Sequence, residues 1–265
     1  MWKEKVVIIT GSSMGIGRSL AIEIGKKGGK LIINARNNNR LEKTYKELMA
    51  MGLELVAYSG DISNYEDCVK IVEYAVDNFG KVDVLINNAG LTAEGTLEES
   101  SPEVFKKLMD VNFLGSVFMT KAALPYIKQT KGSILFIGSL AGIHGLGNYS
   151  AYSSSKMALT ALVESLKKET YQTGIHIGIA YVGFTENDSQ KTYYDKNGAL
   201  KPLPERKIIK PKPVKEVVYQ LMDMIESRRY KLAFTFVGKL NAILNRFFPA
   251  LVYRILLNAY QRQNK

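Results

Sequence analysis

A glycine-rich turn between an apolar run and a helical pattern most constrains how this chain can fold. Residues 6–9 are β-branched throughout (Val-Val-Ile-Ile), which predicts a buried strand. Residues 10–17 follow as Thr-Gly-Ser-Ser-Met-Gly-Ile-Gly, and residues 18–27 favour a helix. Glycines at such a junction let a ligand approach the backbone, and the helix N-terminus offers free N–H groups to a phosphate. The junction therefore predicts a nucleotide site, with a turn that merely needs glycine as the alternative.

The same alternation of apolar runs and helical patterns continues along the chain. Further strands are predicted over residues 30–35, 53–59, 82–86, 133–137, 176–182 and 231–237, and further helices over residues 41–51, 65–79, 152–173 and 214–225. Strands that alternate with helices form parallel βαβ units, with ligands at the carboxyl ends of the strands. The sequence thus predicts one doubly wound α/β domain of the Rossmann type over residues 1–265. Its seven-stranded parallel sheet would carry helices on both faces.

A tyrosine and a lysine four residues apart, Tyr152 and Lys156, are the candidates for proton transfer. On a helix these positions share a face, so the ammonium can approach the phenol. A free phenol has a pKa of about 10, and a neighbouring cation stabilises the phenolate and lowers that value. Ser139, at the end of a predicted strand, could return over the same pocket and hydrogen-bond a substrate oxygen.

The end of the second predicted strand indicates which cofactor is bound. An acidic residue there would bind the ribose 2′-hydroxyl of NAD(H), but the strand ends in Asn34, Ala35 and Arg36. A guanidinium suits a 2′-phosphate instead, so NADP(H) is predicted. Two alternatives stay open: Arg36 is a solvated loop charge, or Arg40 is the phosphate ligand.

These motifs, together with Asn87-Asn88-Ala89-Gly90 after the fourth strand, resemble the classical short-chain dehydrogenases/reductases in order and spacing. The resemblance covers residues 5 to about 187. It implies that Tyr152 is the general acid–base and that Lys156 holds the nicotinamide ribose and lowers the Tyr152 pKa. It further implies that Ser139 polarises the carbonyl. Asn112 would kink a helix and position a water that leads protons to the lysine.

The resemblance also implies a set of cofactor-binding residues and no metal site. One departure affects the end of the sixth strand, where the usual proline is absent and either Thr185 or Asn187 would meet the nicotinamide carboxamide. The cofactor set is Gly11, Ser13, Met14, Gly15, Ile16, Gly17, Arg36, Asp61, Ile62, Asn88, Ala89, Gly90, Val111, Tyr152, Lys156, Val182, Thr185 and Asn187. The family commonly forms homodimers and homotetramers, here through helices around residues 101–128 and 152–173.

The last quarter of the chain carries most of its net charge of +11. Residues 201–265 hold fourteen Lys/Arg against four Asp/Glu. Residues 188–213 are polar and broken by proline, which indicates either a variable substrate lid or a surface insertion without a catalytic role. Residues 238–265 are apolar and basic and favour a helical extension. Its wide apolar face needs burial against this chain, a partner subunit or an anionic membrane surface.

Several classes of protein are disfavoured. A single cysteine, Cys68, suits a reducing compartment, and neither a signal peptide nor a spanning helix is expected. A cytoplasmic location follows, with peripheral contact at the cytoplasmic membrane face left open. No groove-reading helix or aromatic-basic stripe indicates nucleic-acid binding. The sequence predicts an NADP(H)-dependent oxidoreductase that reduces a hydrophobic ketone. The alternatives are an NAD(H)-linked alcohol or steroid dehydrogenase, or a catalytically silent dinucleotide sensor.

Overall fold

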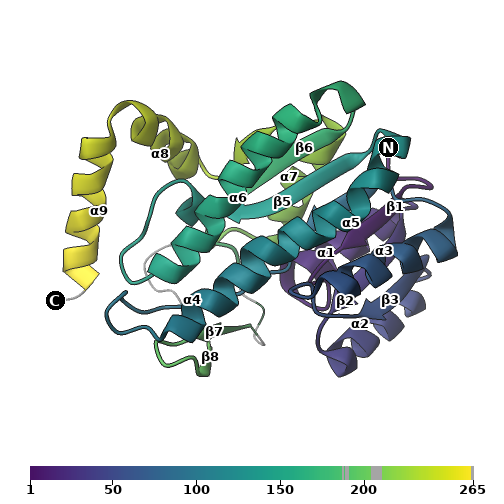
Figure 1. Cartoon of the computed structure of the whole chain (residues 1–265), viewed down its shortest axis with the longest axis horizontal. Coiled ribbons are helices and arrows are strands. Elements are labelled where there is room, and N and C mark those ends of the chain that lie inside the picture. Colours follow the sequence, from purple (N-terminus) through teal and green to yellow (C-terminus); the bar gives the residue numbers. More distant parts are fainter. Residues whose placement is uncertain (187, 189–190, 204–210, 264–265) are drawn as a thin grey trace.

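The computed structural model describes residues 1–186, 188, 191–203 and 211–263, and a parallel sheet lies at its centre (Figure 1). The strands of this sheet lie in the order β3-β2-β1-β4-β5-β6-β9, and every neighbouring pair is parallel. They are β1 (Val6–Ile9), β2 (Lys30–Ala35), β3 (Leu55–Ser59), β4 (Val84–Asn87), β5 (Ser133–Ser139), β6 (His176–Val182) and β9 (Lys231–Ala233). The predicted doubly wound α/β fold is confirmed.

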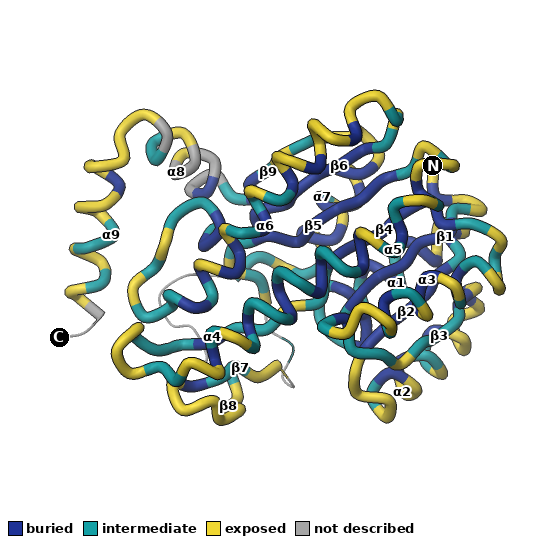
Figure 2. Tube along the Cα trace, in the orientation of Figure 1, coloured by how far each residue is buried: buried dark blue, intermediate teal, exposed yellow. Residues whose placement is uncertain are grey.

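Alternate side chains of each strand build two separate cores, one on each face of the sheet. Val7 and Ile9 belong to the core that α1, α2 and α7 cover, whereas Val6 and Ile8 belong to the core under α3, α5 and α6. These helices are α1 (Gly15–Lys26), α2 (Asn38–Ala50), α7 (Val214–Glu226), α3 (Tyr65–Phe79), α5 (Gly115–Thr130) and α6 (Ser150–Glu169). Because both faces are covered, β1 has no solvated side and is apolar throughout (Figure 2).

The helical connection between β4 and β5 is interrupted. α4 (Pro102–Leu108) runs into a π-helical segment, Met109–Leu114, before α5 begins. Asn112 lies in this segment and is fully buried. Such segments are uncommon and are frequent at functional sites. A π-helical segment therefore lies at Asn112, where the family resemblance implies a kinked helix.

The seventh strand of the sheet is shorter than the sequence predicts. A strand is expected over residues 231–237, but β9 ends at Ala233 and helix α8 (Phe236–Phe247) follows. The Thr235 hydroxyl accepts a hydrogen bond from the backbone N–H of Gly238 at 2.9 Å. A threonine N-cap thus starts a helix within an apolar run that is compatible with a strand. The prediction for residues 234–237 is wrong for this reason.

The predicted lid, residues 188–213, includes regular structure. β7 (Thr192–Tyr194) and β8 (Leu200–Pro202) form an antiparallel ladder. The backbone N–H of Tyr194 donates to the Thr92 carbonyl at 2.9 Å, and that of Glu94 donates to the Tyr194 carbonyl at 3.0 Å. The ladder is therefore joined to the segment that follows β4. Residues 189–190 and 204–210 lie outside the described part of the chain.

Two helices occupy the C-terminal region between Phe236 and Gln263. α8 and α9 (Pro249–Gln263) form an arm at the end of the molecule opposite α2 and β3 (Figure 1). Figure 2 shows that much of this arm is exposed. Across the residues that the structure describes, every helix is too short or too polar to cross a membrane.

Two glycines of the turn after β1 provide a matched test of how this turn packs. Gly11 and Gly15 both have positive φ, +62° and +55°, but only Gly11 is enclosed. A Cβ at Gly11 would lie 2.7 Å from the Ala89 Cα, whereas none of the surrounding atoms lies within 4 Å of a Cβ at Gly15. We predict that Gly11→Ala lowers the free energy of unfolding by about 2–5 kcal/mol and Gly15→Ala by about 1 kcal/mol. Urea unfolding measures both values, and equal losses would contradict this packing.

Candidate active site

The carboxyl ends of β1 and β4 meet at the point where the strand order reverses, and side-chain hydrogen bonds join them. The Thr10 hydroxyl accepts from the backbone N–H groups of Asn88 and Ala89, both at 3.0 Å. The Asn88 amide donates to the carbonyls of Thr10 at 2.8 Å and Gly11 at 3.0 Å. In open α/β sheets, this switch point is where ligands bind. The glycine-rich turn and residues 87–90 therefore form one rigid floor at the expected ligand site.

The glycine-rich turn is open on the side where a phosphate is expected. Gly17 packs closely against the Asn88 amide, but Gly15 faces free space. The Gly15 backbone N–H donates to the Asp188 carboxylate at 3.3 Å. An anionic group thus already lies at the N-terminus of α1, which fits the binding of a phosphate there. Met14 and Ser13 precede this N–H, and Ile16 follows it within the first turn of α1.

Two guanidinium groups lie near the end of β2. The Arg36 guanidinium is 3.6 Å from the Asp61 carboxylate, and its side chain is 40% exposed. The Arg40 guanidinium reaches the Met14 sulfur at 3.3 Å. Ile62, which follows Asp61, is buried. Arg36 and Arg40 therefore both border the predicted adenosine side of the site, so the choice between them as phosphate ligands stays open.

Lys156 is buried in the centre of the site. Its side chain extends from α6, and its ammonium donates to the Ile137 carbonyl of β5 at 3.0 Å. The residue is only 6% exposed. Burial, together with a smaller effect of the positive charge of Lys191, lowers the pKa of Lys156 to about 8. A lysine that exchanges its proton this near neutrality is suited to proton transfer.

Asn112 brings the π-helical segment into contact with the same site. Its amide donates to the Ser155 hydroxyl at 2.9 Å and to the Leu91 carbonyl at 3.0 Å. Its carbonyl oxygen accepts from the Leu91 backbone N–H at 2.7 Å. A Cβ at Gly90 would lie 3.2 Å from the Asn112 oxygen and 3.3 Å from the Lys156 nitrogen. Asn112 and Lys156 therefore both lie against the same side of Gly90.

Ser139 and Tyr152 lie at the two ends of the loop that leads into α6. Ser139 ends β5, and its hydroxyl oxygen accepts from the Ala141 backbone N–H at 3.2 Å. Because that bond uses only a lone pair, the hydroxyl hydrogen can still be donated to a substrate oxygen. Tyr152 lies in the first turn of α6, one turn before Lys156. It packs against a small buried cluster made of Ala93, Val104, Leu108 and Ala151.

Three of the remaining predicted cofactor residues lie in the described part of the chain. Val111 is buried in the π-helical segment, and Val182 ends β6 beside Ser139. Thr185 forms an isolated β-bridge with Lys212, and its hydroxyl donates to the Gly183 carbonyl at 3.3 Å. Asn187 lies outside the described residues, so the choice between Thr185 and Asn187 stays open.

Sequence reasoning missed four residues that contribute to the site. Thr10 and Ser155 orient Asn88 and Asn112, while Asp188 and Lys191 bring lid charges to Gly15 and Lys156. Thr10 and Ser155 lie within or beside the quoted motifs and could have been singled out as hydroxyls next to buried amides. The two lid residues carry no such local signal.

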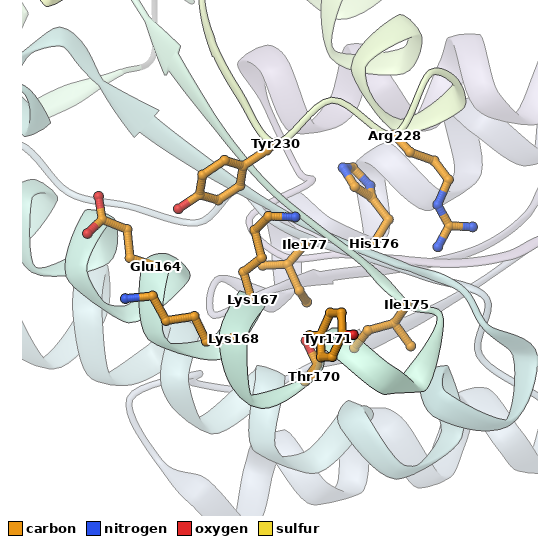
Figure 3. Close-up of a pocket in the computed structure, with 10 residues that line it drawn as sticks. All are labelled: Glu164, Lys167, Lys168, Thr170, Tyr171, Ile175, His176, Ile177, Arg228 and Tyr230. Atoms are coloured by element: carbon orange, nitrogen blue, oxygen red, sulfur yellow. The ribbon is translucent and has the colours of Figure 1, made fainter.

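A separate hollow of about 640 Å³ lies at the amino-terminal ends of β6 and β9, far along the strands from these residues (Figure 3). It is lined by Glu164, Lys167, Lys168, Thr170, Tyr171, Ile175, His176, Ile177, Arg228 and Tyr230. None of these belongs to the predicted site, so the hollow does not bear on the chemistry argued from Lys156 and Tyr152.

Comparison with known proteins finds a family model and curated relatives that match this chain. A family model described as short chain dehydrogenase matches residues 5–198. The 11-beta-hydroxysteroid dehydrogenase-like 2 of Arabidopsis thaliana is 40% identical over 186 residues, which are 69% of this chain and 60% of that protein. The 3-ketodihydrosphingosine reductase of Bos taurus is 34% identical over 208 residues, 76% of this chain and 61% of that protein. The chain thus spans about three fifths of the length of these curated relatives.

Solved structures show the same architecture. An alcohol dehydrogenase from the archaeon Thermococcus sibiricus, complexed with 5-hydroxy-NADP, has a TM-score of 0.76 at 29% identity. The match covers 87% of this chain and 95% of that one. A short chain dehydrogenase/reductase from Burkholderia phymatum in complex with NAD has a TM-score of 0.81 at 23% identity, over 94% of this chain and 95% of that one. At that identity the second likeness concerns the fold alone.

The burial of Lys156 makes a prediction about how stability depends on pH. Its pKa is about 8 in the folded chain against 10.5 for an ordinary lysine, so the unfolded chain binds more protons between these values. The loss of unfolding free energy caused by burying this ammonium is therefore fully present below pH 8. It disappears as pH rises towards 10.5. Relative to Lys156→Met, the wild type should gain about 2 kcal/mol of unfolding free energy between about pH 7 and about pH 9.5.

Urea unfolding of both proteins at the two pH values measures this gain. The control is Lys70→Met, which removes an exposed lysine of α3 and should leave the pH dependence unchanged. A pH-independent difference between wild type and Lys156→Met would show that Lys156 keeps an ordinary affinity for its proton.

Proposed function

Because the chain belongs to the short chain dehydrogenase family, we propose that it interconverts a ketone and a secondary alcohol with NADP(H), mainly as a reductase of hydrophobic substrates. One observation carries this proposal: Lys156 is buried beside Gly90 and Asn112 and lies one helical turn after Tyr152. Burying an ammonium costs stability, and such a cost is better explained by function than by packing. A silent dinucleotide sensor could use Lys156 to hold a ribose, but it has no need of Ser139, Tyr152 and Asn112 as well, which disfavours this alternative.

The bound dinucleotide would supply the hydride, and the side chains of this chain handle the oxygen and its proton. The Ser139 hydroxyl donates to the ketone oxygen and so stabilises the negative charge that develops there. The Tyr152 phenol gives its proton to the same oxygen. The Lys156 ammonium lowers the pKa of that phenol by its charge and binds the nicotinamide ribose.

Asn112 and Ser155 act as positioning residues for this chemistry. Their hydrogen bond at 2.9 Å joins the π-helical segment to α6 between Tyr152 and Lys156. The Ser155 hydroxyl in turn donates to the Tyr152 carbonyl at 2.8 Å. Both bonds hold the first turn of α6 in place, so the phenol and the ammonium keep their orientation when substrate binds.

The preference for NADP(H) over NAD(H) rests on Arg36 and Arg40. Both guanidiniums border the end of β2, where a 2′-phosphate would lie, and β2 ends without an acidic residue. The alcohol dehydrogenase from Thermococcus sibiricus, whose complex contains 5-hydroxy-NADP, supports the same preference. A guanidinium–phosphate contact stabilises the bound cofactor by about 1.5–3 kcal/mol.

Replacing Arg36 tests this preference. We predict that Arg36→Ala raises KM for NADPH by about 10- to 100-fold and leaves KM for NADH unchanged, because only NADPH has the ribose 2′-phosphate. Initial-rate measurements with both cofactors give the two values. Arg229→Ala, which removes an exposed arginine far from the site, is the control. A constant ratio of the two KM values in Arg36→Ala would assign the phosphate to Arg40 or reject NADP(H).

A hydrophobic substrate is supported by two observations. The curated relatives are named for steroid and ketodihydrosphingosine substrates, which are lipid-like carbonyl or alcohol compounds. The apolar arm α8–α9 also lies against the loop that joins Ser139 to Tyr152, because the Asn245 amide donates to the Ile143 carbonyl at 3.1 Å. An NAD(H)-linked alcohol or steroid dehydrogenase remains the alternative within the family.

The decisive assay for this function is NADPH consumption with long-chain, steroid and small ketones. We predict turnover with at least one apolar ketone, and a fall in kcat of about 10²- to 10⁴-fold in Tyr152→Phe because the proton donor is lost. NADPH affinity, measured by fluorescence titration, should stay within about threefold of wild type. Tyr171→Phe removes the hydroxyl of an exposed tyrosine and is the matched control. Full activity in Tyr152→Phe would overturn the mechanism.

A further inference from the structure

The arm formed by α8 and α9 has an inner side that contacts the catalytic loop. Gly238 packs so closely on Leu140 that a Cβ there would lie 2.7 Å from the leucine side chain. The Asn245 amide donates to the Ile143 carbonyl at 3.1 Å. Gly147 leaves no room for a Cβ against the Tyr260 ring. Three contacts thus join the arm to residues 140–147, which link Ser139 to Tyr152.

The outer side of the arm is a stripe of exposed apolar side chains. Leu240, Ile243 and Phe247 recur at helical spacing on α8, and Leu251 and Ile255 recur on α9, with Phe248 between the helices. Their exposed fractions are 45%, 57%, 66%, 49%, 53% and 59%, in the order Leu240, Ile243, Phe247, Leu251, Ile255, Phe248. Exposed apolar side chains that recur in this way on two successive helices indicate a surface that binds something.

The charge of the arm indicates what this surface binds. Residues 236–263 contain neither aspartate nor glutamate, and the exposed basic side chains described there are Arg254 and Arg262. A symmetric dimer through the arm would place these cations against their own copies without a carboxylate between them. Anionic lipid headgroups would neutralise the same cations while the acyl chains cover the apolar stripe. Each helix is too short to span a bilayer, with 12 and 15 residues, so the arm would lie in the interface.

We propose that the outer side of the arm docks on an anionic lipid surface and that the catalytic pocket receives its apolar ketone from that surface. The delivery of the ketone rests on the proposed function, whereas the docking on lipid does not. The three inner contacts place the docked arm directly beside the loop of Ser139 and Tyr152. A ketone dissolved in lipid would therefore reach the site without crossing bulk water, which raises its effective concentration.

Vesicle flotation of the full chain tests the docking. We predict binding to phosphatidylcholine vesicles that contain phosphatidylserine, and weak binding to phosphatidylcholine alone. A triple variant, Ile243→Ser with Phe248→Ser and Ile255→Ser, should bind the anionic vesicles at least about tenfold more weakly than wild type, because its apolar anchors are gone. The matched control, Met49→Ser with Met51→Ser and Tyr171→Ser, removes three exposed apolar side chains elsewhere and should bind as wild type does. Equal binding by both triple variants, or none by wild type, would overturn the proposal.

Kinetics test the delivery of substrate. With a ketone carried in anionic vesicles, the triple variant of the arm should show a KM about tenfold higher than the control variant, but the same KM for a small water-soluble ketone. Failure to reduce any ketone would reject the proposed function, whereas the flotation result would still decide the docking. A dimer of wild type that becomes monomeric in the arm variant, without loss of vesicle binding, would assign the stripe to a second copy and contradict the proposal.

Discussion

The hydrogen bonds of Thr10 and Asn88 are the constraint on which the rest of the site depends. They join the turn after β1 to the turn after β4, at the one place in the sheet where the order of strands reverses. Gly11 packs against Ala89 because the two turns are so close, and Gly90 in turn lies beside Lys156 and Asn112. The floor for a dinucleotide and the groups for proton transfer are therefore parts of one packed unit.

Lys156 shows how stability and function oppose each other in this unit. Its ammonium is nearly buried and has the Ile137 carbonyl as its hydrogen-bond acceptor. Burial lowers its pKa to about 8, which means that folding works against the charged form at neutral pH. The two well-formed cores on either side of the sheet offset this cost. A charge that the fold tolerates at such a position is better explained by chemistry than by packing.

Much of the fold could be predicted because parallel strands buried on both faces are continuous apolar runs, as residues 6–9 and 31–33 show. The predicted seventh strand is too long because the mostly apolar residues 231–237 fit a strand or a helix equally well. Only the Thr235 cap favours the helix. The hydrogen bond from Asn112 to Ser155 joins residues 43 positions apart, and the contact of Asp188 with Gly15 joins residues 173 positions apart. Such pairs follow from topology, and local patterns do not contain them.

The central claim is that Tyr152 and Lys156 serve hydride transfer to a ketone, and the fate of that hydride tests it most directly. The enzyme would be incubated with an apolar ketone and NADPH deuterated at the hydride-donating carbon, and the products analysed by mass spectrometry. The account predicts an alcohol with deuterium on the carbon that bears the new hydroxyl, at a rate that falls sharply in Tyr152→Phe. Bound cofactor without deuterium in any product would contradict it and identify the chain as a dinucleotide-binding protein without this activity.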